Sequence, residues 1–178
     1  MNKNMNKALF LDRDGIINYT VSDGRTSRPP KHIKEVRIMY GIETVLIYAI
    51  QEGFFPIVVT NQPDVARGNQ KIEVIEEINT YIKGKLPIID FFTCIHDNQD
   101  NCVCRKPKSG LLHFAAQKYN IELWKSFMVG DRNQDILAGN NAGCKTIYVN
   151  DEGIKNNLAT FSVSSVYNII DIIGSKNV

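Results

Sequence analysis

The stretch Ala8-Leu9-Phe10-Leu11-Asp12-Arg13-Asp14-Gly15 joins four apolar residues directly to a pair of aspartates. An uninterrupted apolar run of this length is typical of a strand buried on both faces of a parallel sheet. In open α/β sheets, ligands bind at the carboxyl ends of the strands. The stretch therefore predicts a first strand that carries Asp12 and Asp14 into a functional site. Because side chains two residues apart in a strand share a face, both carboxylates are expected to act on one group.

Apolar runs at 55–59, 127–129 and 146–149 repeat the pattern of the first strand. Between them, amphipathic stretches predict helices at about 41–52, 71–84, 109–120 and 133–142. A last short strand and helix are expected within 161–173. This alternation predicts an α/β fold with a doubly wound parallel sheet. The segment 19–40 interrupts it and is expected to be a long functional loop.

Length and composition limit the functions that the chain can have. Its 178 residues are enough for one domain, spanning 1–178, and 43% hydrophobic with 22% charged residues is ordinary for a globular protein. A net charge of +2 argues against a broad nucleic-acid surface. No apolar run is long enough to span a membrane, and the first residues have no signal-peptide core. We expect a cytoplasmic monomer with no membrane or nucleic-acid partner.

Polar motifs follow the apolar runs at four places: Asp12-Arg13-Asp14-Gly15, Thr60-Asn61-Gln62, Arg105-Lys106-Pro107 and Gly130-Asp131-Arg132. Each motif alone is a common turn or strand end, since Asp, Asn and Gly are ordinary turn residues. In this order, however, they resemble the four motifs of the haloacid dehalogenase superfamily over roughly residues 7–150. The resemblance implies that superfamily's α/β core with its site at the carboxyl edge of the sheet. A receiver-like binding module also gathers acids there, so a non-catalytic, zinc-stabilised phosphate-binding module remains an alternative.

The resemblance implies a Mg²⁺-dependent phosphatase that forms an aspartyl-phosphate. Asp12 would be the nucleophile, and Asp14 would protonate the leaving oxygen and then activate water. Mg²⁺, which prefers hard oxygen ligands, would be held by the Asp12 and Asp131 carboxylates and the Asp14 carbonyl. Thr60 would donate its hydroxyl to a phosphoryl oxygen, and Lys106 would neutralise the charge of the intermediate.

Further side chains are expected around this centre. Those implied to bind substrate are Asn61, Gln62, Arg67, Arg105 and Arg132. A forked guanidinium at Arg105 suits a second phosphate or hydroxyl groups. Arg25 and Arg28 of the 19–40 loop are candidates for a second phosphate, with solvated surface charge as the alternative. Asp135 is expected to support the metal site or its helix N-terminus rather than to ligate.

A cluster of soft ligands lies at about 94–104, where Cys94-Ile95-His96 is followed by Cys102-Val103-Cys104. Three thiolates and one imidazole match a closed Cys₃His zinc site, which is structural because it leaves no open position. The alternative is reduced surface cysteines beside an incidental histidine. Zinc here would fix the backbone that leads into Lys106.

The Cys-x-His and Cys-x-Cys-Arg-Lys-Pro element is similar to that of the D-glycero-D-manno-heptose 1,7-bisphosphate phosphatases and the related histidinol-phosphatases, which are small members without a large cap. This resemblance implies a phosphorylated sugar substrate, foremost the 7-phosphate of the heptose bisphosphate in cell-envelope precursor (lipopolysaccharide) synthesis. Histidinol phosphate is the alternative substrate. A DNA 3′-phosphatase would share the chemistry, but the near-neutral charge argues against it.

Overall fold

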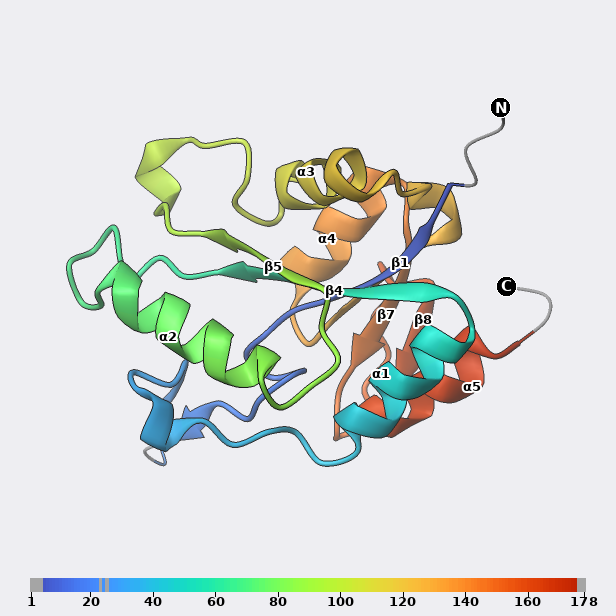
Figure 1. Ribbon diagram of the computed structural model, residues 1–178, viewed down its shortest axis with the longest axis horizontal. Coiled ribbons are helices and arrows are strands. Elements are labelled where there is room, and N and C mark those ends of the chain that lie inside the picture. The colour runs from blue at the N-terminus through green and yellow to red at the C-terminus, as the bar shows by residue number, and fades with distance from the viewer. Residues whose placement is uncertain (1–4, 23, 25, 176–178) are drawn as a thin grey trace.

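The computed structural model describes residues 5–22, 24 and 26–175, which form a sheet between two layers of helices (Figure 1). The main sheet of the described residues has six strands in the order β5-β4-β1-β6-β7-β8, and all its pairings are parallel. Its strands are β1 Lys7–Leu11, β4 Phe54–Asn61, β5 Asp90–Cys94, β6 Phe127–Gly130, β7 Lys145–Val149 and β8 Phe161–Val163. The α/β fold with a doubly wound parallel sheet is thus confirmed.

Helices α3 and α4 cover one face of the sheet, and α1, α2 and α5 lie on the other (Figure 1). Their bounds are α1 Ile42–Gln51, α2 Ile72–Lys83, α3 Gly110–Tyr119, α4 Asn133–Ala142 and α5 Ile169–Ile173. Short 3-10 turns occur at η1 Ile33–Glu35, η2 Asn98–Asp100, η3 Leu123–Lys125 and η4 Val166–Asn168. No described helix is both long and apolar enough to cross a membrane.

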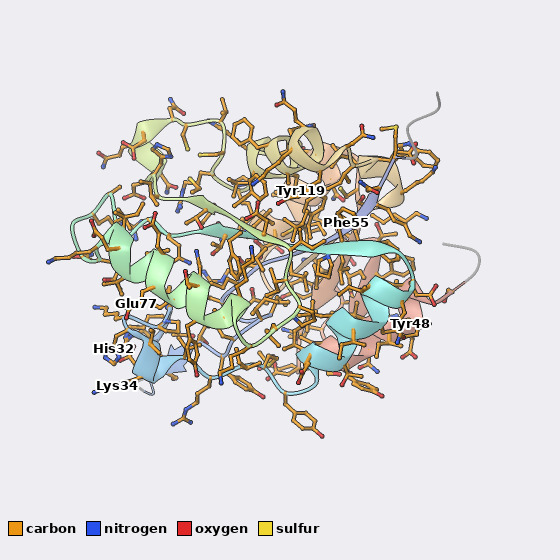
Figure 2. The ribbon with its side chains drawn as sticks, viewed as in Figure 1. His32, Lys34, Tyr48, Phe55, Glu77 and Tyr119 are labelled. Carbon is orange, nitrogen blue, oxygen red and sulfur yellow. The ribbon has the colours of Figure 1, made fainter. Side chains whose placement is uncertain are left out.

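Strand β1 supplies both halves of the core. Its residues Leu9 and Leu11 pack with α1, α2 and α5, while Ala8 and Phe10 pack with α3 and α4. Because alternate side chains of the strand face the two opposite helix layers, both of its faces are buried, which explains the unbroken apolar run. On the second face, the Phe55 ring of β4 also packs edge to face on the Tyr119 ring of α3, with ring centroids 6.4 Å apart. Both residues are labelled in Figure 2.

The sheet reverses its winding direction at β1. The chain runs from β1 to β4 and β5 on one side, then returns to β6, β7 and β8 on the other. Leu11 pairs in register with both Val58 and Val129, and the Asp12 amide donates to the Val129 carbonyl at 3.0 Å. The ends of β1, β4 and β6 therefore meet at the position where doubly wound sheets bind ligands.

Two segments differ from the sequence prediction. Strand β5 was not predicted, although it forms one edge of the sheet. The 19–40 segment is not only loop: it contains β2 Val21–Ser22 and β3 Ser27–Arg28, which pair as an antiparallel hairpin, and the turn η1. Arg28 forms a two-bonded ion pair with Glu35 at 2.8 and 2.9 Å, whereas Arg25 lies outside the described residues.

Candidate active site

Lys106 lies at the centre of the carboxyl edge. Its ammonium Nζ is 2.8 Å from Asp12 Oδ1, 2.7 Å from the Val59 carbonyl oxygen and 2.6 Å from Asp135 Oδ1. The side chain is fully buried. Burial lowers the pKa of Lys106, but the two carboxylates outweigh that effect and hold its pKa above the ordinary value. The structure therefore holds a charged ammonium beside the carboxylate at the end of β1.

Asn61 fixes the backbone that carries Lys106. The Asn61 side-chain nitrogen Nδ2 donates to the Lys106 backbone carbonyl at 3.0 Å, and the Lys106 backbone amide donates to Asn61 Oδ1 at 3.1 Å. This pair of hydrogen bonds ties the end of β4 to a loop 45 residues later in the chain. The Asn61 side chain thus positions Lys106, a role distinct from the substrate binding that the resemblance implies for this residue.

Asp12, Asp131 and Asp135 form a carboxylate cluster in which one oxygen from each lies within 4.8 Å of the others. Asp131 Oδ1 is buried and has no hydrogen-bond partner in the structure. Glycines make room for this approach: a Cβ on Gly15 would come 2.2 Å from Asp131 Oδ2, and one on Gly130 would come 2.2 Å from the Asp135 Cβ. A cluster of hard oxygen donors with an unpartnered buried oxygen fits a divalent cation such as Mg²⁺.

Burial also changes the acidity of this cluster. It raises the pKa of Asp12 to about 6, against the opposing effect of Lys106. It raises the pKa of Asp131 to about 6 as well, and the nearby Asp12 adds to this shift. The pKa of Asp135 is raised by burial too, despite its ion pair with Lys106. A bound cation would favour the ionised form of all three carboxylates.

Asp14 follows the end of β1 in a tight turn, where the Gly15 amide donates to the Asn18 carbonyl at 2.8 Å. Its carboxylate accepts hydrogen bonds from the side chains of Arg13, Asn18 and Gln62. Burial works against ionisation, yet the Arg13 charge and these hydrogen bonds outweigh it and hold the pKa of Asp14 below its usual range. These contacts therefore favour the ionised carboxylate of Asp14, which can accept a proton.

The predicted substrate-binding residues are divided between two places. Gln62 and Thr60 lie inside the site, where Gln62 Nε2 donates to Thr60 Oγ1 at 2.8 Å. Arg67 instead donates to both oxygens of Asp97 at 2.7 and 2.8 Å. The Arg105 side chain donates to Asn98 Oδ1 at 2.8 Å and so packs against the 94–104 loop. Arg132 is half exposed beside Asp131, at 3.9 Å.

Cys94, His96, Cys102 and Cys104 come together on one side of Lys106, with their ligand atoms within 4.8 Å of one another. Cys104 Sγ lies 3.3 Å from both Cys94 Sγ and His96 Nδ1. Cys94 Sγ lies 3.6 Å from His96 Nδ1 and 3.7 Å from Cys102 Sγ. Ligand atoms around tetrahedral zinc, with Zn–S bonds of about 2.3 Å, are separated by about 3.8 Å, so the cluster fits this ion. Burial raises the pKa of the Cys94 thiol to about 12, so a cation is needed to hold the thiolate.

Sequence reasoning missed the surroundings of Asp14. Three buried side chains form these surroundings. Arg13 and Asn18 donate to the Asp14 carboxylate, and Asn79 accepts a hydrogen bond from Arg13. The position of Arg13 between two aspartates was a usable signal, because a guanidinium beside carboxylates readily forms a forked ion pair with one of them. Asn79 gave no such signal, since it lies on α2, 66 residues away.

Comparison with known proteins adds to this geometry. A family model described as HAD-hydrolase-like matches residues 103–165. A D-glycero-beta-D-manno-heptose-1,7-bisphosphate 7-phosphatase of Helicobacter pylori is 37% identical over 148 residues, covering 80% of this chain and 82% of the relative. The alpha-named counterpart of Photorhabdus laumondii is 30% identical, covering 91% of this chain and 98% of the relative. The D,D-heptose 1.7-bisphosphate phosphatase of B. bronchiseptica, complexed with magnesium and phosphate, shares the fold at a TM-score of 0.79 and 24% identity, covering 94% of this chain and 97% of that one.

Proposed function

Because this chain belongs to the heptose-1,7-bisphosphate 7-phosphatase family of the haloacid dehalogenase-like phosphatases, we propose that it hydrolyses the 7-phosphate of D-glycero-D-manno-heptose 1,7-bisphosphate. The observation that carries the proposal is the buried Lys106 ammonium beside the cluster of Asp12, Asp131 and Asp135. A phosphate monoester is a dianion, and its transfer needs charge stabilisation next to a nucleophile. These four side chains supply both at the end of β1.

In the first step, Asp12 attacks phosphorus and the bond to the sugar oxygen breaks. Lys106 binds Asp12 at Oδ1 and so orients the carboxylate that attacks. Asp14 gives a proton to the departing sugar oxygen. Since Asp14 is ionised in the structure, it must first take up that proton, and the negative charge of an entering phosphoryl group favours this.

In the second step, water attacks phosphorus and the bond to Asp12 breaks. Asp14, basic again, takes a proton from that water. Thr60 donates its hydroxyl to a phosphoryl oxygen, and Lys106 balances the charge. Mg²⁺, held by Asp12, Asp131 and the Asp14 carbonyl, neutralises further phosphoryl charge when bound.

The surroundings of the site support a sugar bisphosphate. A cavity of about 500 Å³ opens beside Asp131, lined by hydroxyl and amide side chains that include Tyr19, Tyr40, Asn150 and Ser164. Such groups suit the hydroxyls of a sugar. A smaller hollow of about 140 Å³ is lined by Arg105, Lys106 and Lys108, whose charges suit a second phosphate. Asp97 also lines it, but the Arg67 guanidinium neutralises that carboxylate. We therefore propose that Arg105 faces the distal phosphate.

The test is Mg²⁺-dependent phosphate release from both anomers of the heptose bisphosphate, histidinol phosphate and a 3′-phosphorylated oligonucleotide. We expect release from a heptose anomer, and no release by Asp12→Asn with an unchanged circular dichroism spectrum. Release only from histidinol phosphate would identify that compound, and not the heptose bisphosphate, as the substrate. A silent panel with both metals bound would favour the phosphate-binding module.

We also propose that the protein is a single-domain monomer of the cytoplasm without a nucleic-acid partner. The zinc cluster supports the compartment, because its three thiols must stay reduced. The near-neutral charge of +2 supports the absence of nucleic acid.

A further inference from the structure

Arg13 is the largest fully buried side chain among the described residues, although a guanidinium is among the groups least often found inside proteins. A buried charge is stable only when it is paired and its donors are satisfied. Its Nε donates to Asp14 Oδ1 at 3.3 Å and its Nη2 to Asp14 Oδ2 at 3.0 Å. The two side chains are neighbours in sequence, so this fork on the carboxylate is a local feature of the turn after β1.

The Asp14 carboxylate accepts four hydrogen bonds, two on each oxygen. Besides the Arg13 fork, Asn18 Nδ2 donates to Oδ1 at 3.0 Å and Gln62 Nε2 donates to Oδ2 at 2.8 Å. A carboxylate offers about four lone-pair sites, so Asp14 is saturated. Before Asp14 can bind a proton, one of these hydrogen-bond donors must leave. The side-chain amides of Asn18 and Gln62 are neutral and bind less strongly than the Arg13 guanidinium, so one of them leaves first.

Gln62 shows which oxygen faces the reaction. The same Nε2 that donates to Asp14 Oδ2 also donates to Thr60 Oγ1 at 2.8 Å. Thr60 is the proposed phosphoryl ligand, so Oδ2 lies on the phosphoryl side of Asp14. When substrate enters and the Gln62 bond opens, Oδ2 is the atom left free to exchange a proton.

Asn79 anchors the guanidinium from the other direction. Arg13 Nη1 donates to Asn79 Oδ1 at 3.0 Å, and Asn79 Nδ2 in turn donates to Thr93 Oγ1 at 3.3 Å. Asn79 lies on α2 and Thr93 on β5, both at the edge of the sheet far from the carboxylate cluster in sequence. The orientation of Arg13 is thus set by two elements that carry none of the site's carboxylates.

We propose that Arg13 is a positioning residue for proton transfer: anchored on Asn79, its guanidinium holds Asp14 with Oδ2 toward the leaving-group oxygen. The inference rests on the proposed function, in which Asp14 protonates that oxygen. The guanidinium of Arg13 bonds to the Asp14 carboxylate and to Asn79, and forms no hydrogen bond with the carboxylates of Asp12 or Asp131. Its loss should therefore slow release of a leaving group that needs a proton, and the later activation of water by Asp14, but not release of a leaving group that needs no proton.

The experiment compares leaving groups in single-turnover assays of the holoenzyme. An alkyl phosphate, either the active heptose anomer or glycerol 2-phosphate, loses an alkoxide that needs a proton, whereas p-nitrophenyl phosphate loses a stable anion that does not. A positioned acid contributes roughly 10²- to 10⁴-fold, so Arg13→Lys, which keeps the charge but loses the fork, should slow alkyl release by about 10- to 100-fold. Release of p-nitrophenolate should change by less than about threefold.

Three further variants keep the result interpretable. Asn79→Leu frees the guanidinium without altering the turn, and should act in the same direction as Arg13→Lys but less. Ile82→Ala on the same helix removes buried apolar surface outside the network, and should lower Tm while keeping the wild-type ratio of the two rates. Asp14→Asn should show the largest selective loss of alkyl release.

Equal slowing of both substrates by Arg13→Lys, or of neither, would overturn the inference and leave Asp14 as the acid. If Asp14→Asn also fails to discriminate the leaving groups, the proposed role of Asp14 is wrong, and the inference falls with it. If Arg13→Lys does not fold, Asn79→Leu decides: a change in its rate ratio supports the inference, and an unchanged ratio overturns it.

Discussion

At the scale of single residues, the site is a set of buried charges that balance one another. Lys106 is shared between Asp12 and Asp135, while Arg13 neutralises Asp14. Asp131 has a weaker partner, since the Arg132 guanidinium is 3.9 Å away and half exposed. Asp131 is thus the carboxylate with most to gain from a cation, because an unpaired buried charge is costly.

The effect of Mg²⁺ on stability should therefore depend on pH. Burial raises the pKa of Asp12 and of Asp131 from 3.8 to about 6. The metal-free folded protein binds these protons more tightly than the unfolded chain, so ionising the two groups lowers stability as pH rises between those values. A bound cation relieves that loss. We expect the rise in Tm caused by Mg²⁺, relative to EDTA, to be small at about pH 5 and larger at about pH 7.5.

Calorimetric melts at the two pH values, with Mg²⁺ or with EDTA, measure this difference. Asp131→Asn is the control, and its Mg²⁺ shift should be smaller and less dependent on pH, because only Asp12 of the two groups still titrates there. The same Mg²⁺ shift at both pH values in the wild-type protein would contradict the prediction.

The residue scale is also where prediction from sequence was least complete. The approach of Lys106 to Asp12, 94 residues apart, was expected from the order of the motifs. The Arg13–Asn79 contact was not, because burial of an arginine depends on a partner that local sequence does not reveal. Arg67 was expected near substrate, but its bonds to Asp97 exist only because two loops meet.

At the scale of elements, helix bounds were predictable to within one residue, as for α2 at Ile72–Lys83 against an expected 71–84. The positive φ of Gly41 and of Gly143 marks the start of α1 and the end of α4. Strand β5 escaped prediction because Asp90 interrupts its apolar run. The presence of an aspartate in this strand is explained by tertiary contacts, since Asp90 Oδ2 accepts hydrogen bonds from Lys118 Nζ and Tyr119 Oη of α3 at 2.7 and 2.8 Å.

Helix α4 should not tolerate a methyl group at Gly139. A Cβ there would come 2.6 Å from both the Met128 Cβ and the Thr146 Cγ2, so the helix would have to move off β6 and β7. We expect Gly139→Ala to lower stability by about 1–3 kcal/mol in urea unfolding. Gly84→Ala is the matched control, since its Cβ meets only carbonyl oxygens at 3.5 and 3.6 Å and should leave stability nearly unchanged. A Gly139→Ala protein as stable as wild type would mean that α4 packs less closely on the sheet.

The 94–104 loop should depend on zinc for its structure. Among its residues, only Cys94 and Cys104 are buried, and the polar residues between them cannot form a core. We expect Cys102→Ser to lose about one zinc per chain and to lower Tm. Cys144→Ala, which changes a buried cysteine outside the cluster, should keep its zinc. Elemental analysis of purified proteins measures both, and wild-type protein free of zinc would refute the structural role.

At the scale of the whole molecule, some large apolar side chains are exposed on the described surface. The most exposed of them, Tyr40, Val103 and Trp124, lie on different segments of the chain. Scattered apolar residues are normal on monomers, whereas stable interfaces need a contiguous patch. We expect light scattering after gel filtration to give the monomer mass of 20.1 kDa. A mass of twice that value, persisting on dilution, would show a dimer.

The central place of β1 also has a consequence during synthesis on the ribosome. β1 is complete at Leu11, but its neighbour β6 ends only at Gly130. At roughly 5–20 residues per second, the nascent chain spends on the order of ten seconds with one edge of its central strand unpaired. Unpaired apolar edges favour aggregation. Changes that weaken β6 should thus reduce the yield of soluble protein during expression, while the molecules that do complete their fold keep their full rate of turnover.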